Sequence, residues 1–599
     1  MNSETKICQN CKKEFVIEPE DFDFYQKIKV PAPTFCPECR LIRRMIFRNE
    51  RSLYKRKCDA PDHNEDIISI YSPDKPLKIY DQKYWWSDSW DPMEYGRDYD
   101  FSKPFFEQFN ELLMAVPRPP SIGSNNINSD YTNYGIYNKN CYLIVSAEKN
   151  EDCLYGHRLF FNRDCVDCEN IHSSELCYQC FQCINCYKCI FSQRLENCND
   201  LFFCFDCRNC QNCFSCVGLR NKQYHIFNKP YTKEQYFSKL KEFGLDYYSK
   251  SLRLKEEFED FYLKFPRRFA EVIKSENCVG NNINNSKNCF NSFVIKESKD
   301  LKYVTFAVKA FSSMDGSYID FSEWTYESFS GEQDSNKLFT CQCWFSNNLQ
   351  YCDSCTSSFH LFACIGLRNK QYCILNKQYT KEEYEKLVPK IIQHMNDMPY
   401  IDKKGRVYKY GEFFPPELSP FAYNETVAQE YFPLTKEQAL KQGYSWKDPE
   451  ERDIKPDIKT AELPDHIKDV KDDIIGKVIQ CAHAKLGKDG TLETNCNEQC
   501  TTAFKIIEPE LQFYRRMNLP LPRLCPNCRH YQRLKQRNPL KLWHRKCMCG
   551  GQTSTNGVYK NTIKHFHGNQ PCPNEFETTY APDRPEIVYC EKCYLDEVV

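Results

Sequence analysis

The sequence predicts a mainly β protein with capping helices, built around a Cys-rich β-solenoid in two repeats with a small metal-binding module at each end. Three observations predict this fold class: paired Cys-x-x-Cys motifs near both ends, cysteines that recur in steps of twelve, and a repeat within the middle of the chain. The 599 residues include 38 Cys, 39 Tyr and 42 Phe, and they contain no run of eighteen apolar residues. This composition argues against general disorder and against a transmembrane helix.

The first residues lead straight into Cys8-x-x-Cys11 without the apolar stretch of a signal peptide. We therefore expect a cytoplasmic, reducing location and no membrane partner. In that setting cysteines bind metal or pack as thiols more often than they form disulfides.

Four cysteines near the N-terminus have the spacing of a zinc site: Cys8, Cys11, Cys36 and Cys39. Each pair presents two sulfurs from one tight turn, and two such pairs can close a tetrahedron around Zn²⁺. Four thiolates leave no open position for water or substrate, which indicates a structural role.

The same pattern returns after a constant shift of 489 residues. Cys11 falls on Cys500, and Cys36-Pro-Glu-Cys39 falls on Cys525-Pro-Asn-Cys528, whereas Cys8 would fall on Asn497 beside Cys496. The ligands predicted for this second copy are Cys496, Cys500, Cys525 and Cys528.

Both segments resemble the zinc-binding module, of zinc-ribbon or treble-clef type, that occurs in many uncharacterised bacterial Cys-rich proteins. The resemblance rests on the Cys-x-x-Cys, Phe-Tyr, Pro and Cys-Pro-x-Cys-Arg signature and covers about a fifth of the chain. It implies a zinc-ribbon module at each end of the solenoid, with a metal site and a small β-rich knuckle, and it implies no reaction.

A related appendage follows each copy, because Tyr71-Ser-Pro-Asp-Lys-Pro matches Tyr580-Ala-Pro-Asp-Arg-Pro. Only the C-terminal appendage carries a further pair, Cys590-x-x-Cys593, where the N-terminal one has Asp81 and Tyr84. The other two ligands of this site would come from Cys547, Cys549 and Cys572, and His565 and His567 are further candidates. The sequence does not decide among these five, and Cys547 and Cys572 are the candidate pair. The whole chain would then hold two to three structural Zn²⁺ ions, and Cys58 with His63 would remain an unmetallated pair.

The cysteines of the middle open short segments of a preferred length of twelve, and the residue before each is often Asn or Asp. The openings are Cys141, Cys153, Cys165, Cys177, Cys186, Cys198 and Cys210. Short rungs with a polar corner predict a β-solenoid, since Asn tolerates left-handed backbone and stacked Asn side chains can bond from rung to rung. The stretch from Cys216 to Tyr236 returns after a shift of 148 at Cys364 to Tyr384, so we expect two such repeats.

Capping boxes predict helices after Thr232, Thr380 and Thr435, with Gly443 ending the last. The expected organisation is zinc ribbon 1 (1–60), a degenerate appendage and connector (61–119), solenoid repeat 1 (120–229), a helical cap (230–275), solenoid repeat 2 (276–379), a second helical cap (380–395), a connector with a helix (396–476), zinc ribbon 2 (477–546) and the C-terminal zinc site (547–599).

Cysteines also recur every three residues over 177–189 and 204–216. Packed reduced thiols, a metal site, and an iron–sulfur cluster or disulfides all remain open for these runs. The second repeat has Ser358 and Leu361 where Cys210 and Cys213 would align, which argues against a cluster needed in both repeats.

Positive charge gathers beside the two ribbons, although the net charge of the chain is −1. Arginines recur there at helical spacing and suit phosphate contacts, so the first hypothesis is a zinc-binding scaffold that binds nucleic acid, RNA before DNA, through Arg40, Arg43, Arg44, Arg48, Arg529, Arg533 and Arg537. The alternative is a protein–protein interaction scaffold with purely structural zinc and no nucleic-acid binding. An enzyme is the third hypothesis, and we find no catalytic motif and identify no small-molecule substrate.

Overall fold

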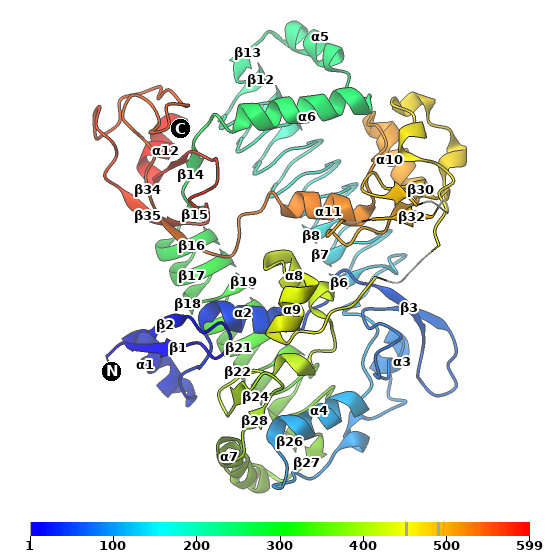
Figure 1. Cartoon of the computed structure of the whole chain (residues 1–599), viewed down its shortest axis with the longest axis vertical. Coiled ribbons are helices and arrows are strands. Elements are labelled where there is room, and N and C mark those ends of the chain that lie inside the picture. The colour runs from blue at the N-terminus through cyan, green and yellow to red at the C-terminus, as the bar shows by residue number, and fades with distance from the viewer. Residues whose placement is uncertain (1, 450–452, 488–490, 495, 599) are drawn as a thin grey trace.

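The computed structural model describes residues 2–449, 453–487, 491–494 and 496–598. This described part consists mostly of strands, with twelve α-helices and a Cys tetrad near each end (Figure 1). The expectation of a mainly β chain with four-cysteine groups near both termini is therefore confirmed. No helix among the described residues is long and apolar enough to cross a membrane.

Residues 123–230, called here the first ladder, form parallel strands in which each residue pairs with the one twelve positions later, as Leu159 does with Ile171. Isolated bridges such as Tyr178–Ile190 keep the same offset between the named strands. The antiparallel β13 (Lys229–Pro230) ends the ladder. Its parallel strands are β5 (Gly123–Ser124), β6 (Asn133–Ile136), β7 (Val145–Glu148), β8 (His157–Phe160), β9 (Glu169–His172), β10 (Asn199–Phe202), β11 (Gln211–Phe214) and β12 (Gln223–Ile226).

Residues 272–378, called the second ladder, repeat this arrangement and again end in an antiparallel strand, β27 (Lys377–Gln378). The offset is eleven at the start of β16 and becomes twelve after a bulge between Val279 and Gly280. The parallel strands are β15 (Val272–Ile273), β16 (Glu276–Asn284), β17 (Lys287–Lys296), β18 (Lys299–Lys302), β19 (Thr305–Val308), β20 (Phe311–Asp320), β21 (Glu323–Glu332), β22 (Ser335–Leu338), β23 (Cys341–Trp344), β24 (Asn347–Gln350), β25 (Phe359–Phe362) and β26 (Gln371–Ile374).

A left-handed residue recurs about every third position along both ladders, for example at Asp152, Tyr155 and Arg158. Each twelve-residue segment therefore turns at four corners, where the sequence had indicated one. Left-handed backbone costs about 1–2 kcal/mol for a residue with a side chain. Hydrogen bonds to both neighbouring segments offset this cost, because Asp152 N donates to Lys139 O and Glu151 N donates to Asn162 O, each at 3.0 Å.

Asn side chains stack along one corner as expected. The amide of Asn185 donates to Asn197 at 3.1 Å, and the series continues through Asn209 to Asn221 at 3.2 Å per step.

Thiols fill the interior of the first ladder. The cysteines follow left-handed residues and are nearly fully buried, and their S–H groups point at backbone carbonyls, as Cys180 Sγ does at Cys189 O (3.1 Å). Burial raises the pKa of Cys204 and Cys207 well above the ordinary thiol value, whereas hydrogen bonds from neighbouring thiols lower the pKa of Cys177 and Cys210. Of the three alternatives for these runs, the burial and the contacts with backbone carbonyls favour packed thiols.

Three helices begin where the capping boxes predicted them: α5 (Lys233–Phe243), α7 (Lys381–Asp397) and α9 (Lys436–Gln442). The first two follow the ladders, and the third ends at left-handed Gly443. A further helix, α6 (Tyr248–Tyr262), continues the first cap, after which β14 (Arg267–Arg268) is extended. The connector contains α8 (Val427–Tyr431) and short 3₁₀ turns.

The two terminal modules pack on the ladders in a crossed order. The N-terminal module precedes the first ladder in sequence, yet its helix α2 (Pro37–Met45) lies against β20 and β21 of the second ladder (Figure 1). The C-terminal module follows the second ladder in sequence, yet Phe513 and Tyr514 of α10 (Glu508–Met517) pack on Tyr178 of the first ladder. The chain therefore folds back so that α2 and α10 pack on the ladder farther from them in sequence, while β35 (Glu575–Thr578) also contacts β16 of the second ladder.

The N-terminal module contains β1 (Glu4–Ile7), β2 (Glu14–Ile17), α1 (Pro19–Ile28), α2 (Pro37–Met45), β3 (Tyr54–Lys57), β4 (Asp66–Ser69), α3 (Gln82–Trp86) and α4 (Phe105–Ala115). The C-terminal module contains β30 (Ile479–Gln480), β31 (Lys485–Leu486), β32 (Leu492–Glu493), β33 (Ala503–Phe504), α10 (Glu508–Met517), α11 (Pro526–Leu534), β34 (Trp543–Lys546), β35 (Glu575–Thr578), β36 (Val588–Tyr589) and α12 (Glu591–Val598).

We predict that the ladder interior accepts small side chains and rejects larger ones. Cys180→Ala should lower the melting temperature only slightly, whereas Cys180→Leu should destabilise the fold by about 1–3 kcal/mol because it overpacks a fully buried position. Thermal unfolding followed by circular dichroism measures both. A Leu variant as stable as the Ala variant would show that the thiols are not close-packed.

Candidate metal centres

The N-terminal tetrad brings together the four predicted cysteines. Cys8 follows β1, Cys11 lies in the turn before β2, and Cys36 and Cys39 open α2. The Sγ atoms of Cys11 and Cys36 are 3.7 Å apart, close to the edge of about 3.8 Å expected when thiolates surround one ion at about 2.3 Å. Hydrogen bonds from Cys36 and Cys39 lower the pKa of Cys8 well below its usual value. This group could hold a metal ion.

The second tetrad contains Cys481, Cys500, Cys525 and Cys528, with all donor atoms within 4.8 Å of one another. Cys481 thus stands where the sequence analysis had placed Cys496. It is the structural equivalent of Cys8, because Cys525 N–H donates to Cys481 Sγ at 3.3 Å just as Cys36 N–H donates to Cys8 Sγ.

Cys496 lies beside this tetrad in a different group, with His483, Glu498 and Cys528. Its Sγ is 3.4 Å from His483 Nδ1 and 4.0 Å from Cys528 Sγ. The sequence comparison missed Cys481 because sixteen extra residues separate it from Cys500, relative to the spacing from Cys8 to Cys11. The available signal was Ile479-Gln480-Cys481, an extended pair followed by Cys like Lys6-Ile7-Cys8.

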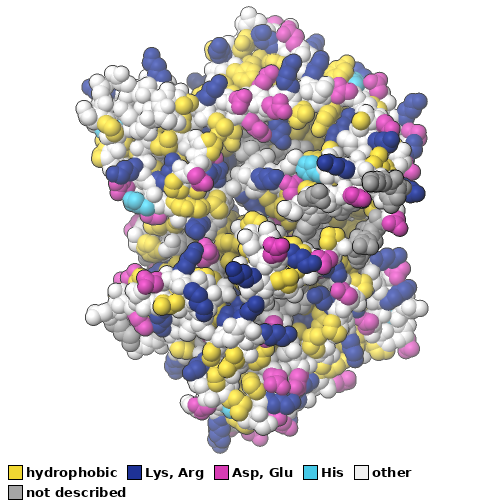
Figure 2. Space-filling view, in the orientation of Figure 1, with side chains coloured by type: hydrophobic (Ala, Val, Ile, Leu, Met, Phe, Trp, Pro, Cys, Tyr) yellow, Lys and Arg dark blue, Asp and Glu magenta, His cyan; other side chains and the backbone are white. Residues whose placement is uncertain are grey.

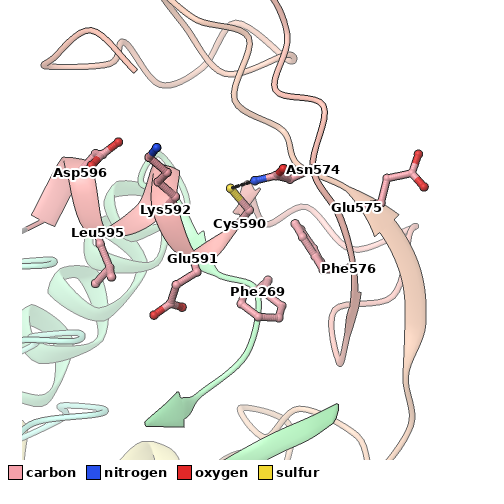
Figure 3. Close-up of a pocket in the computed structure, with 9 residues that line it drawn as sticks. All are labelled: Phe269, Asn574, Glu575, Phe576, Cys590, Glu591, Lys592, Leu595 and Asp596. Carbon is pink, nitrogen blue, oxygen red and sulfur yellow. Dashed lines mark hydrogen bonds between the residues drawn. The ribbon is translucent and has the colours of Figure 1, made fainter. Parts of the chain in front are cut away.

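The third tetrad contains the candidate residues Cys547, Cys572, Cys590 and Cys593, all buried. Cys572 Sγ lies 3.9 Å from Cys590 Sγ and 3.7 Å from Cys593 Sγ. Asn574 donates its amide to Cys590 Sγ at 3.3 Å (Figure 3). Both residues line a hollow of about 460 Å³ between β35 and α12. Hydrogen bonds from Cys547 and Cys593 lower the pKa of Cys590 well below its usual value.

The N-terminal appendage keeps the backbone of this third site but not its ligands. Asp81 N–H donates to Cys58 Sγ at 3.2 Å, as Cys590 N–H does to Cys547 Sγ. His63 contacts the carboxylates of Glu65 and Asp81 and packs edge-on against Tyr84. Cys58 and His63 therefore use protein partners.

The arginines of the first basic segment are buried and paired with carboxylates of this chain. Arg40 and Arg44 contact Asp315 of the second ladder at 2.9 and 3.4 Å. Arg43 lies 2.7 Å from Glu327 and 2.8 Å from Glu412. Arg48 binds Glu50 and stacks between two tyrosine rings.

The second basic segment repeats this arrangement on the first ladder. Arg529 and Arg533 contact the two carboxylate oxygens of Asp167 at 2.6 and 2.9 Å. Arg537, whose side chain is 11% exposed, lies between Glu169 and Glu430. The seven arginines proposed for phosphate contacts therefore face inward and already have anionic partners.

A buried histidine joins the two modules. His157 of the first ladder lies between Glu50 of the N-terminal module (2.7 Å) and Glu169 (3.0 Å), which in turn faces Arg537 of the C-terminal module (3.7 Å). Burial disfavours the charged imidazole, but the two carboxylates outweigh this and raise the pKa of His157 to about 9. The imidazolium is thus an internal counter-ion at the junction.

The chain matches no known protein-family model, and a search of curated proteins likewise finds no match.

We predict that Cys481, and not Cys496, completes the second tetrad. Cys481→Ser should lose one bound metal ion per chain and lower the melting temperature, because the ion also fixes the start of α11. Cys496→Ser should keep that ion. Elemental analysis of the full chain, purified with the two variants side by side, measures the difference. Loss of the ion in Cys496→Ser alone would contradict the assignment.

Proposed function

We propose that this protein is a zinc-stabilised interaction scaffold whose two ladders are β-solenoids and whose metal modules hold those solenoids together. The observation that carries the proposal is the use of the module arginines: α2 and α11 each begin at a Cys tetrad and direct their arginines onto ladder carboxylates. The metal sites therefore support internal packing.

Zinc is the proposed ion because each tetrad offers four thiolates at tetrahedral spacing. Four soft sulfur ligands suit zinc, and a closed set of four is typical of structural rather than catalytic sites. In each of the first two tetrads two sulfurs come from the start of a helix, where the helix dipole favours negative charge.

Nucleic-acid binding through the seven arginines gains no support from this fold. A guanidinium that contacts a buried carboxylate would have to leave it, at a cost of several kcal/mol, before it could contact a phosphate. Figure 2 shows basic and acidic side chains interspersed over one face, which differs from the continuous basic surface typical of nucleic-acid binding.

The ladder surface carries the features of a protein-binding face. One corner row of the first ladder contains Tyr137, Lys149 and Phe161, spaced by twelve. The equivalent row of the second ladder contains Phe321 and Phe345, which are 48% and 46% exposed. Exposed aromatic side chains on a rigid, regular surface are the usual anchors of protein interfaces.

We predict that Arg40→Met and Arg529→Met destabilise the fold by about 3 kcal/mol, because each removes one of the two arginines that pair with a buried aspartate. Lys541→Met, which alters a half-exposed lysine of the same basic segment, is the matched control and should be neutral. Denaturant unfolding measures stability, and a titration with single-stranded RNA at two salt concentrations measures binding. Stable arginine variants with a weakened salt dependence would favour nucleic-acid binding instead.

We also predict that Phe321→Ser with Phe345→Ser removes protein partners without unfolding the chain. Leu440→Ser, which alters an equally exposed residue of α9 that belongs to neither ladder, is the control. Chemical crosslinking in lysate with and without nuclease treatment, read by mass spectrometry, compares the two variants with the unaltered protein. Partners that are lost on nuclease treatment, or that bind all three proteins equally, would count against a ladder interface.

A further inference from the structure

A second group of ligands adjoins the third tetrad. Cys549, His565, His567 and Cys593 place their donor atoms within 4.8 Å of one another. Cys593, on α12, belongs to both groups, since its Sγ is 3.7 Å from Cys572 Sγ and 3.4 Å from His567 Nε2. We propose that this module binds two divalent metal ions bridged by the Cys593 thiolate: one held by Cys547, Cys572, Cys590 and Cys593, the other by Cys549, His565, His567 and Cys593.

The first support is the state of His565. Its side chain is fully buried and neither ring nitrogen makes a hydrogen bond among the described residues, although Glu597 Oε1 lies 3.0 Å from Nε2 and Asp596 Oδ2 lies 3.5 Å from Nδ1. A buried imidazole without hydrogen bonds is costly. A bound ion would use one nitrogen and leave the other for the carboxylate, which is the outer partner that metal-bound histidines usually have.

The second support is the orientation of His567 and Cys549. His567 Nδ1 lies 2.6 Å from Gln570 O, a backbone carbonyl that can only accept, so Nδ1 carries the proton and Nε2 keeps its lone pair toward Cys593. Asn561 Nδ2 donates to Cys549 Sγ at 3.2 Å, an arrangement that supports a thiolate. The distance of 3.4 Å from Nε2 to Cys593 Sγ is close to the edge of about 3.5 Å for nitrogen and sulfur on one tetrahedral zinc.

The third support is the comparison of the two appendages. Eight residues (58–65) connect β3 to β4, whereas twenty-eight (547–574) connect the equivalent β34 to β35. The longer connection supplies Cys549, His565, His567 and Cys572. The N-terminal appendage forms the same strand pair without these ligands, so the hairpin itself does not require the extra length.

Charge balance also favours the second ion. Four thiolates around one divalent ion carry a net charge of −2 in a buried site. A second divalent ion that binds two neutral imidazoles and displaces the Cys549 proton brings this to −1. Reducing uncompensated buried charge is favourable.

The test counts metal ions in the full chain by native mass spectrometry. Cys549→Ser and His567→Ala should each bind one ion fewer than the unaltered protein, whereas His544→Ala, an exposed histidine of the same module, should bind the full number. Equal counts in all four proteins would overturn the bridged pair.

This inference builds on the metal-binding proposal, and its failure can be told apart from failure of the tetrads. Cys572→Ser and Cys590→Ser remove ligands of the tetrad alone, so they report on that ion whether or not the second ion exists. Loss of an ion in these variants, with no loss in Cys549→Ser, would keep the tetrad and reject the bridge.

Cobalt substitution of the unaltered protein provides a measurement that no variant's folding can affect. Two Co²⁺ ions that share a thiolate couple their spins, so the paramagnetic signal per cobalt should fall as the last ion binds. A signal that grows in proportion to cobalt up to saturation would overturn the proposal.

Discussion

The contact between module arginines and ladder carboxylates is the constraint on which the rest of the structure depends. Asp315 and Asp167 each receive two arginines, from α2 and α11 respectively. These aspartates are 148 residues apart, which is the shift of the ladder repeat, and Arg40 and Arg529 are 489 apart, which is the shift of the modules. The same interaction has therefore been kept twice in one chain, each time at a left-handed corner of a ladder.

The positions of the Cys tetrads explain how such a contact can be maintained. Bringing two guanidinium groups and a carboxylate out of water is expensive, and the geometry must be accurate for the pairing to offset that cost. In both copies the helix that carries the arginines begins at a Cys of a tetrad, Cys36 or Cys525. An ion held by the tetrad would fix the start of the helix, so that the arginines one turn later would face the ladder without a further loss of backbone freedom.

Much of this arrangement could be predicted from spacing, and the failures have physical causes. The recurrence of Cys at intervals of twelve and three residues predicted the period of the ladders. The paired Cys-x-x-Cys motifs predicted the first tetrad, and both patterns reflect local backbone geometry. Cys481 was missed since an insertion of sixteen residues breaks the register while leaving the hydrogen bond to Cys525 N–H intact. The arginines were correctly placed on one helix face, but spacing alone cannot say whether that face meets phosphate or a buried aspartate.

The crossed packing has a consequence for cooperativity. Since the N-terminal module lies on the second ladder and the C-terminal module lies on the first, neither half of the chain contains a complete module–ladder pair formed from neighbouring sequence. The two crossings meet at His157, where Glu50 from one module and Glu169 from the ladder hold an imidazolium beside Arg537 of the other module. A local opening of either module removes a charged partner from this buried junction, Glu50 in one case and Arg537 in the other, and thereby weakens the contacts that hold the other module. The chain therefore behaves as one unit, and the Cys tetrads of the two modules are energetically linked through buried charge at the junction between them.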